Sequence, residues 1–424
     1  MDLLVRNAAQ LIRVAEHGER KKCGQAMREI GVIENGSALI RDGRIAWAGK
    51  DSDLPAAANG ASEIDASGRI VLPGFIDSHT HLVFAGSRAD EFEQRIAGRS
   101  YQEIAKAGGG INATVKRVRA AAKDELKQRT RSRLDFMLHH GVTTVEIKSG
   151  YGLTLADERK CLEAVSDLKA EHPCEIVATF LGAHEVPPEY RADRGAYVQL
   201  VTNEMIPEVA RRGLAEFCDV FCEQGVFRLD ESEVILRAGL AHGLKAKIHA
   251  DEFSPLGGAE LAGRLRATSA DHLLKITSAG IEALKTGGTI ATLLPGTAFF
   301  LGLHYAPARE LIDRDLPVAL ATDCNPGSCR TENLPLIGTI ACTQMKMLPA
   351  EVVTALTLNA AAAVGRNDRL GSIEVGKQAD LVICDVPSYQ ELFYHFGVNH
   401  VRCVIKAGRV VVLADADVRS GVLP

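Results

Sequence analysis

Eight short apolar stretches, each followed by a segment of helical character, constrain the fold of this chain more than any other feature. The stretches are IVLPGFI (70–76), VTTVEI (142–147), EIVATFL (175–181), EFCDVF (216–221), LKAKIH (244–249), ATSADH (267–272), TIATLL (289–294) and PVALAT (317–322). Strands that alternate with helices over about 250 to 300 residues predict an α/β fold, the (β/α)8 barrel. The alternative is an open doubly wound sheet, but the number of strands and the lack of a GxGxxG turn favour the barrel.

The two ends of the chain have a different pattern. Short strands and turns are predicted over the first ~65 residues, including a hairpin at 38–49 with Asp42-Gly43 at its turn. Strands are also predicted at 381–386 and 401–413, the second with Ala407-Gly408 at a turn. We therefore expect a smaller β-structured part beside the barrel.

Polar residues gather at the ends of six predicted barrel strands, where the active site of such a barrel lies. They are Asp77, His79 and His81; Lys148 and Tyr151; His184 and Glu185; His249, Asp251 and Glu252; Asp271 and His272; and Asp323 and Asn325. Because side chains alternate along a strand, the two histidines of HTH (79–81) point the same way. They can converge on one ion, which His249 and Asp323 can reach across the barrel mouth. The pattern predicts a metal site.

Several of these residues also have a plainer interpretation. An isolated HxH is often part of a polar rim, and only the further histidines and acids at other strand ends favour a metal site. Lys148 could be catalytic or could pair with Glu146 or a loop acid, and the ion pair is the favoured interpretation. Arg88, in AGSRADEF (85–92), could be an ordinary solvated charge.

Composition narrows the class of protein further. A formal net charge of −5 leaves no bulk positive field to attract nucleic acid or a membrane surface, and no apolar run reaches the length of a spanning helix. The N-terminus lacks the apolar core of a secretory signal. Ten cysteines are scattered without CxxC pairs, which predicts reduced thiols in a cytoplasmic protein.

The stretch PGFIDSHTH (73–81), with a later His, His and Asp at strand ends, resembles the amidohydrolase superfamily of metal-dependent hydrolases. The stretch GSIEVGKQADLVICD (371–385) resembles the return of that superfamily into its small β-sandwich. The resemblance implies a (β/α)8 barrel over residues 67–369 and a composite β-sandwich from residues 1–66 and 370–424. Six further stretches that include Arg88, Tyr151 and ATDCNPGS (321–328) resemble members that hydrolyse a small cyclic amide with a carboxylate tail.

The resemblance also implies a single metal ion. Two-metal members of the superfamily place a lysine on the fourth strand, whereas the corresponding stretch here, FCDVFCEQG (217–225), has none. The implied ligands are His79, His81, His249 and Asp323. Three nitrogens and one carboxylate oxygen suit a zinc ion and also an iron ion, and the sequence does not choose between them.

The resemblance assigns roles to the remaining strand-end residues. Glu252 is expected to act as the general base, with His272 polarising the carbonyl or sharing that role, and Asp323 is expected to pass a proton to the leaving nitrogen. A bidentate bond from Arg88 is expected to hold the carboxylate tail. The other expected substrate contacts are Tyr151, His184, Asn325, Gly327 and Ser328.

Two other functions stay open at this point. A deaminase of heterocyclic bases would use the same metal face but would not need Arg88. A non-catalytic relative would use the barrel as a scaffold and would have lost ligands, all four of which are present here. A homodimer is expected from the resemblance alone, and neither nucleic acid nor a membrane is an expected partner.

Overall fold

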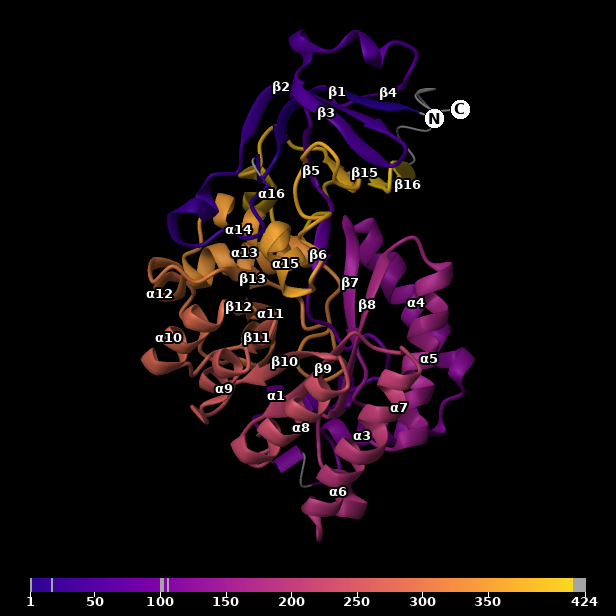
Figure 1. Ribbon diagram of the computed structural model, residues 1–424, viewed down its shortest axis with the longest axis vertical. Helices are drawn as coiled ribbons and strands as arrows, with labels where there is room; N and C mark the ends of the chain where they lie inside the picture. The colour runs from indigo at the N-terminus through magenta and orange to yellow at the C-terminus, as the bar shows by residue number, and fades with distance from the viewer. Residues whose placement is uncertain (1, 17, 100–102, 105–106, 415–424) are drawn as a thin grey trace.

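The computed structural model describes residues 2–16, 18–99, 103–104 and 107–414. The larger part is a barrel of parallel strands surrounded by helices, and a smaller sheet formed by both ends of the chain lies at one end of it (Figure 1). Residues 415–424, the end of the expected second sandwich segment, lie outside the described residues. In the described part of the chain, no helix combines the length and apolar character needed to cross a membrane.

Eight parallel strands form the barrel and confirm the predicted fold class. They are β6 (Phe75–Asp77), β7 (Val142–Lys148), β8 (Glu175–Ala183), β9 (Phe217–Cys222), β10 (Lys245–Ala250), β11 (Ser269–His272), β12 (Ile290–Leu293) and β13 (Val318–Leu320), hydrogen-bonded in sequence order. Past the ends of β6 and β13, Thr80 and Cys324 form a parallel bridge, and His81 N–H donates to the Cys324 carbonyl at 3.0 Å. The sheet is thus nearly closed.

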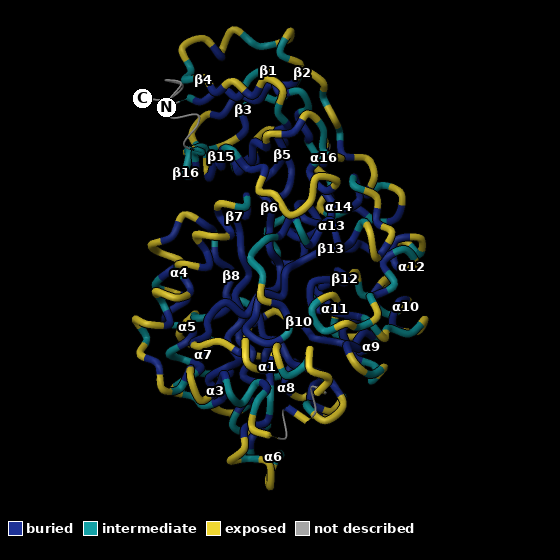
Figure 2. Tube along the Cα trace, turned by 180° about the vertical axis from the view of Figure 1, so that it is seen from behind, coloured by how far each residue is buried: buried dark blue, intermediate teal, exposed yellow. Residues whose placement is uncertain are grey.

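Helices cover the outside of this barrel (Figure 1). They are α1 (Ala89–Ile96), α3 (Ile111–Ala120), α4 (Lys123–His139), α5 (Leu155–Glu171), α6 (Arg194–Leu200), α7 (Ile206–Arg211), α8 (Leu229–Ala241), α9 (Gly258–Arg264), α10 (Ser278–Gly287), α11 (Pro295–Leu301), α12 (Ala308–Asp313), α13 (Leu334–Met345), α14 (Pro349–Leu356) and α15 (Leu358–Ala363). A further short helix, α16 (Glu391–Tyr394), packs against α13 beside the small sheet. The barrel strands are buried, while the helices expose their outer faces (Figure 2). Both faces of a parallel sheet are normally covered in this way.

The smaller part is one continuous eight-stranded sheet. Its strands are β1 (Leu3–Ile12), β2 (Val32–Arg41), β3 (Arg44–Lys50), β4 (Ser62–Asp65), β5 (Ile70–Pro73), β14 (Leu381–Cys384), β15 (Val401–Lys406) and β16 (Arg409–Leu413). The side chains of Val5, Ile40, Ile383 and Ile405, from both ends of the chain, share one core. The expected β-sandwich therefore takes the form of a single sheet with its own core.

The first predicted barrel strand, residues 70–76, is divided between the two parts. Residues Ile70–Pro73 pair with β1 and β14 in the small sheet, and only Phe75–Asp77 enter the barrel. The break is at Gly74, where a Cβ atom would lie 2.3 Å from Thr143 Oγ1, so only glycine fits this close approach. The first segment of the small sheet consequently runs to Pro73, rather than to residue 66 as expected.

Candidate active site and metal centre

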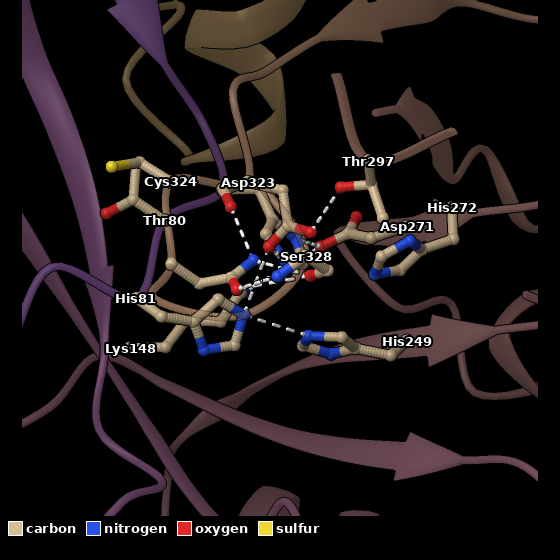
Figure 3. Close-up of polar contacts among 12 residues, drawn as sticks. Thr80, His81, Lys148, His249, Asp271, His272, Thr297, Asp323, Cys324 and Ser328 are labelled. Carbon is tan, nitrogen blue, oxygen red and sulfur yellow. Dashed lines mark hydrogen bonds and ion pairs between the residues drawn. The ribbon is translucent and has the colours of Figure 1, made fainter. Parts of the chain in front are cut away.

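Four side chains from three places in the barrel converge at its carboxyl end. His79 and His81 follow β6, His249 lies within β10, and Asp323 follows β13. His249 Nε2 lies 3.3 Å from His81 Nε2, and Asp323 Oδ1 lies 3.5 Å from His79 Nε2 and 3.4 Å from His81 Nε2. Figure 3 shows His81 and His249 facing each other beside Asp323. The structure thus brings together the four ligands predicted from the sequence.

These four donors fit a bound cation. His79 Nε2 is buried and has no hydrogen-bond partner, which a buried polar atom rarely tolerates. His79, His81 and His249 each offer a nitrogen, all within 4.8 Å of one another. Burial is the largest of the effects that hold the pKa of His79 and His81 well below the ordinary value, so both rings are neutral. Neutral imidazole is the form that binds metal ions.

The other nitrogens of two of these rings contact buried acids. His79 Nδ1 lies 2.6 Å from Asp271 Oδ2, and His249 Nδ1 lies 3.1 Å from Asp219 Oδ1. An ionised carboxylate only accepts hydrogen bonds, so each Nδ1 carries the hydrogen and each Nε2 keeps a free lone pair. Asp219 lies on β9 and was not predicted as a site residue, because the sequence of that strand indicated only the absence of the lysine found in two-metal enzymes.

A cavity beside the metal donors is lined by the other predicted site residues. The lining consists of His81, Arg88, Ile111, Tyr151, His184, Phe221, His249, Glu252, Phe253, His272, Leu301, Asp323, Asn325, Gly327 and Ser328. Every residue predicted for the site is among them except His79, which does not line this cavity. The apolar lining residues Ile111, Phe221, Phe253 and Leu301 were not predicted, because nothing distinguishes them in sequence from other core residues.

Glu252 and His272 lie side by side on this cavity. Glu252 Oε1 is 3.6 Å from His272 Nδ1, and both side chains are almost fully buried. Burial, followed by the charges of Asp323 and Glu223, holds the pKa of Glu252 well above its ordinary value. A carboxyl group with a raised pKa is suited to proton transfer near neutral pH.

Three residues at the strand ends have unusual backbone conformations. The φ angles are +51° at Asp251, +79° at His272 and +54° at Asp323. Each such left-handed residue costs roughly 1–3 kcal/mol, and residues of this kind cluster at functional sites. The cost is consistent with a site in which side-chain direction matters more than local stability.

Arg88 differs from the expectation in one respect. Its Nε donates to Glu91 Oε2 at 2.9 Å, and its Nη2 lies 2.7 Å from the same oxygen, so this edge of the guanidinium is committed to the protein. Nη1 points toward Gly327, where a Cβ atom would lie 2.0 Å from it. A bidentate bond to a substrate from the Nε–Nη2 edge is therefore ruled out, and glycine at position 327 leaves the space that Arg88 occupies.

The loop at Asn325–Ser328 also differs from the expectation. The backbone N–H groups of Gly327 and Ser328 both donate to Asn325 Oδ1 at 2.8 Å, and Asn325 Nδ2 donates to Ser328 Oγ at 2.8 Å. The backbone N–H groups of Gly327 and Ser328, two of the expected substrate contacts, are thus used within the loop. The side chains of Asn325 and Ser328 remain on the cavity wall.

Three further strand-end residues support the framework. Asp77 accepts from Thr322 Oγ1 at 2.6 Å and joins β6 to β13. Asp251 accepts from the backbone N–H groups at the start of α9, and Glu185 accepts from the N–H of its neighbour Val186. These three carboxylates accept hydrogen bonds that support the surrounding chain. Their position at a strand end alone therefore did not distinguish them from site residues.

Comparisons with known proteins agree with this geometry. The amidohydrolase family matches residues 62–117 and 237–411. The chain is 52% identical over 414 residues to the imidazolonepropionase of Shouchella clausii, covering 97% of this chain and 93% of that protein. It is 54% identical to the imidazolonepropionase of Geobacillus kaustophilus, covering 97% and 98%. The chain belongs to the imidazolonepropionase family. The resemblance to amidohydrolases is thereby confirmed.

Solved structures of other amidohydrolase-like enzymes share the fold of this imidazolonepropionase family member. An adenosine deaminase from Xanthomonas campestris superposes with a TM-score of 0.73 at 19% identity, covering 99% of this chain and 97% of that one. A triazine hydrolase variant superposes with a TM-score of 0.71 at 18% identity, covering both chains completely. These likenesses extend to the fold only, so the imidazolonepropionase relationship is better supported than the deaminase alternative.

Proposed function

We propose that the protein hydrolyses 4-imidazolone-5-propanoate to N-formimidoyl-L-glutamate, a step of histidine degradation. Water adds to the ring carbonyl, the amide C–N bond breaks, and the leaving nitrogen receives a proton. The observation that carries the proposal is a buried set of three histidines and an aspartate next to a cavity lined by Arg88. The chain that holds this site is 54% identical to an imidazolonepropionase. A nucleobase deaminase would not need that arginine.

The proposed cofactor is one divalent ion, zinc or iron, held by His79, His81, His249 and Asp323. A cation of this kind lowers the pKa of a bound water toward about 7 and so supplies a nucleophile at neutral pH. The inward-facing acid of β9, Asp219, already pairs with Lys148 at 2.8 Å. This pairing supports a site with a single metal ion.

Proton transfer is assigned to the buried pair on the cavity wall. Glu252 accepts the proton of the attacking water, since its carboxyl group lies on the cavity and its pKa is raised by burial. His272, 3.6 Å away, polarises the ring carbonyl or shares the proton. The proton that Glu252 takes from the water then reaches the leaving nitrogen by way of Asp323.

The carboxylate tail of the substrate is assigned to the part of the cavity wall formed by Arg88, Tyr151 and His184. Arg88 supplies the positive charge, and Tyr151 and His184, whose ring centroids are 5.2 Å apart, hydrogen-bond the tail or the ring. His184 Nδ1 lies 3.0 Å from the Gly150 carbonyl, which fixes the direction of this ring. Asn325, Gly327 and Ser328 complete that side of the cavity.

Three other properties of the protein are proposed from its composition, its family resemblance and its architecture. All ten cysteines are free thiols, which suits a reducing cytoplasm. A homodimer is proposed from the family resemblance, and nucleic acid is not proposed as a partner because the net charge is −5. The division into a barrel and a composite small sheet is proposed as a division into two domains.

The test combines a spectral assay with metal analysis. The ultraviolet absorbance of imidazolonepropanoate should fall only when enzyme is added, and cytosine and guanine should be unchanged. One equivalent of zinc or iron should co-purify, and chelation or His249→Ala should remove both the metal and the activity. Turnover of a nucleobase, or two tightly bound equivalents per chain, would contradict the proposal.

A further inference from the structure

Directly behind the metal donors lies a cluster of four charged side chains with no solvent exposure. Glu146 and Lys148 come from β7, Asp219 from β9 and Asp271 from β11. Lys148 Nζ is 2.8 Å from Glu146 Oε1, 2.8 Å from Asp219 Oδ2 and 3.7 Å from Asp271 Oδ2. The favoured interpretation of Lys148 as an ion-pair partner is therefore correct, but one ammonium group is shared by three acids.

Two of these acids connect Lys148 to the metal-binding histidines. The same Asp271 oxygen that faces Lys148 lies 2.6 Å from His79 Nδ1, and the second oxygen of Asp219 lies 3.1 Å from His249 Nδ1. Figure 3 shows Lys148, Asp271 and His249 grouped around the site. A continuous chain of contacts thus runs from one lysine to two ligand rings.

The acids depend on Lys148 for their charge balance. Among the described residues, Lys148 is the only lysine or arginine within ion-pair distance of Glu146, Asp219 or Asp271. Removing one partner of a buried ion pair is strongly destabilising, so without Lys148 the carboxylates of Asp219 and Asp271 would no longer be held in their present positions beside the imidazole rings. Burial alone lowers the pKa of Lys148, but the charges of Asp219, Glu146 and Asp271 outweigh it and raise that pKa. The ammonium form is therefore maintained.

We propose that Lys148 is a positioning residue for the metal site. By holding the carboxylates of Asp219 and Asp271 in place, it fixes the direction of the His249 and His79 rings, so that each Nδ1 faces an acid and each Nε2 faces the metal site. The inference rests on the proposed metal site and extends it to a residue that touches neither metal nor substrate. Its contribution is to the geometry of the metal site, before any substrate binds.

Lys247 provides a matched control. It is also fully buried, on β10, which lies between β9 and β11 in the barrel, but its Nζ donates to the carbonyls of Ser78 and Ala363, at 3.2 and 3.1 Å. No carboxylate is within ion-pair distance of it among the residues described. Lys247→Met therefore removes a buried ammonium of the same kind without disturbing the acids that hold the histidines.

The first experiment measures zinc affinity by competition with a chelator. Loss of such a supporting partner typically weakens metal binding 10- to 100-fold, so Lys148→Met should bind zinc at least tenfold more weakly than the wild type. Lys247→Met should stay within about threefold, even if both variants melt at lower temperature. Equal affinity in Lys148→Met and wild type, or equal losses in the two lysine variants, would overturn the proposal. Failure of the wild type to bind zinc or iron would instead contradict the proposed metal site.

A second experiment needs neither metal nor activity. Histidine-selective ¹⁵N spectra of the metal-free protein should show the Nδ1–H tautomer for His79 and His249 in the wild type and in Lys247→Met. In Lys148→Met these signals should shift toward the other tautomer or average between the two. If Lys148→Met does not fold, Asp219→Asn, which keeps the shape of the side chain, should give the same change at His249 alone. Unchanged tautomers in the folded variants would show that Lys148 has no positioning role.

Discussion

Replacement of Arg88 by methionine should damage catalysis through the substrate tail and leave the metal in place. Arg88 is only 6% exposed to solvent, and Glu91 pairs with the Nε–Nη2 edge of its guanidinium. The tail can therefore gain about one charge-assisted hydrogen bond from it, worth ~1.5–3 kcal/mol. At 1.4 kcal/mol for each factor of ten, kcat/KM should fall by about 10- to 150-fold.

The assay compares two substrates. With imidazolonepropanoate the loss should be in this range, and with an analogue that lacks the carboxylate it should be several-fold smaller. Metal content should not change, because Arg88 is not one of the four proposed ligands. Arg330→Met is the matched control. Arg330 lies just past the Asn325–Ser328 loop, pairs with Glu332, and does not line the active-site cavity. It should keep kcat/KM within about threefold of wild type.

Gly327→Ala perturbs the same contact from the other side. A Cβ atom at 2.0 Å from Arg88 Nη1 must displace the guanidinium, so this variant should show the same preference for loss on the substrate with the tail. If Arg88→Met weakened both substrates equally, Arg88 would be structural through Glu91, whose other oxygen accepts from Gly110 N–H at 3.1 Å. The tail would then have to be held by Tyr151 or the Asn325–Ser328 loop.

Two further variants test other parts of the site. Glu252→Gln keeps the shape but removes the base, so metal should remain while kcat falls by roughly 10²–10⁴-fold, and near-normal turnover would remove Glu252 from the mechanism. Glu158 accepts from the N–H groups of Gly150, Gly152 and Leu153 at 3.0, 2.7 and 2.8 Å and so shapes the loop that carries Tyr151. Glu158→Gln leaves at least one of these donors unpaired, so KM should rise about tenfold with a smaller change in kcat, and an unchanged KM would separate this loop from substrate binding.

Much of the metal site follows from local sequence pattern. Alternation along a strand places His79 and His81 on the same side, and the position of His249 and Asp323 at the ends of other strands brings them to the same mouth once the barrel is accepted. The eight apolar stretches determine that barrel, because a parallel strand buried on both faces has to be apolar over most of its length. These properties depend on residues near one another in sequence, so a single chain is enough to show them.

What only the tertiary structure decided are the contacts between strands and loops. Lys148 meets Asp219 past the intervening strand β8, and Glu91 occupies one edge of the Arg88 guanidinium. Asn325 uses the N–H groups of its own loop. All of these contacts depend on distances that no spacing in the sequence contains. The division of the first predicted strand at Gly74 is of the same kind, since it is caused by Thr143 on the neighbouring strand. Sequence period specifies the direction of a side chain, whereas its partner is chosen by packing among residues far apart in the chain, and the protonation of the histidines depends on that partner.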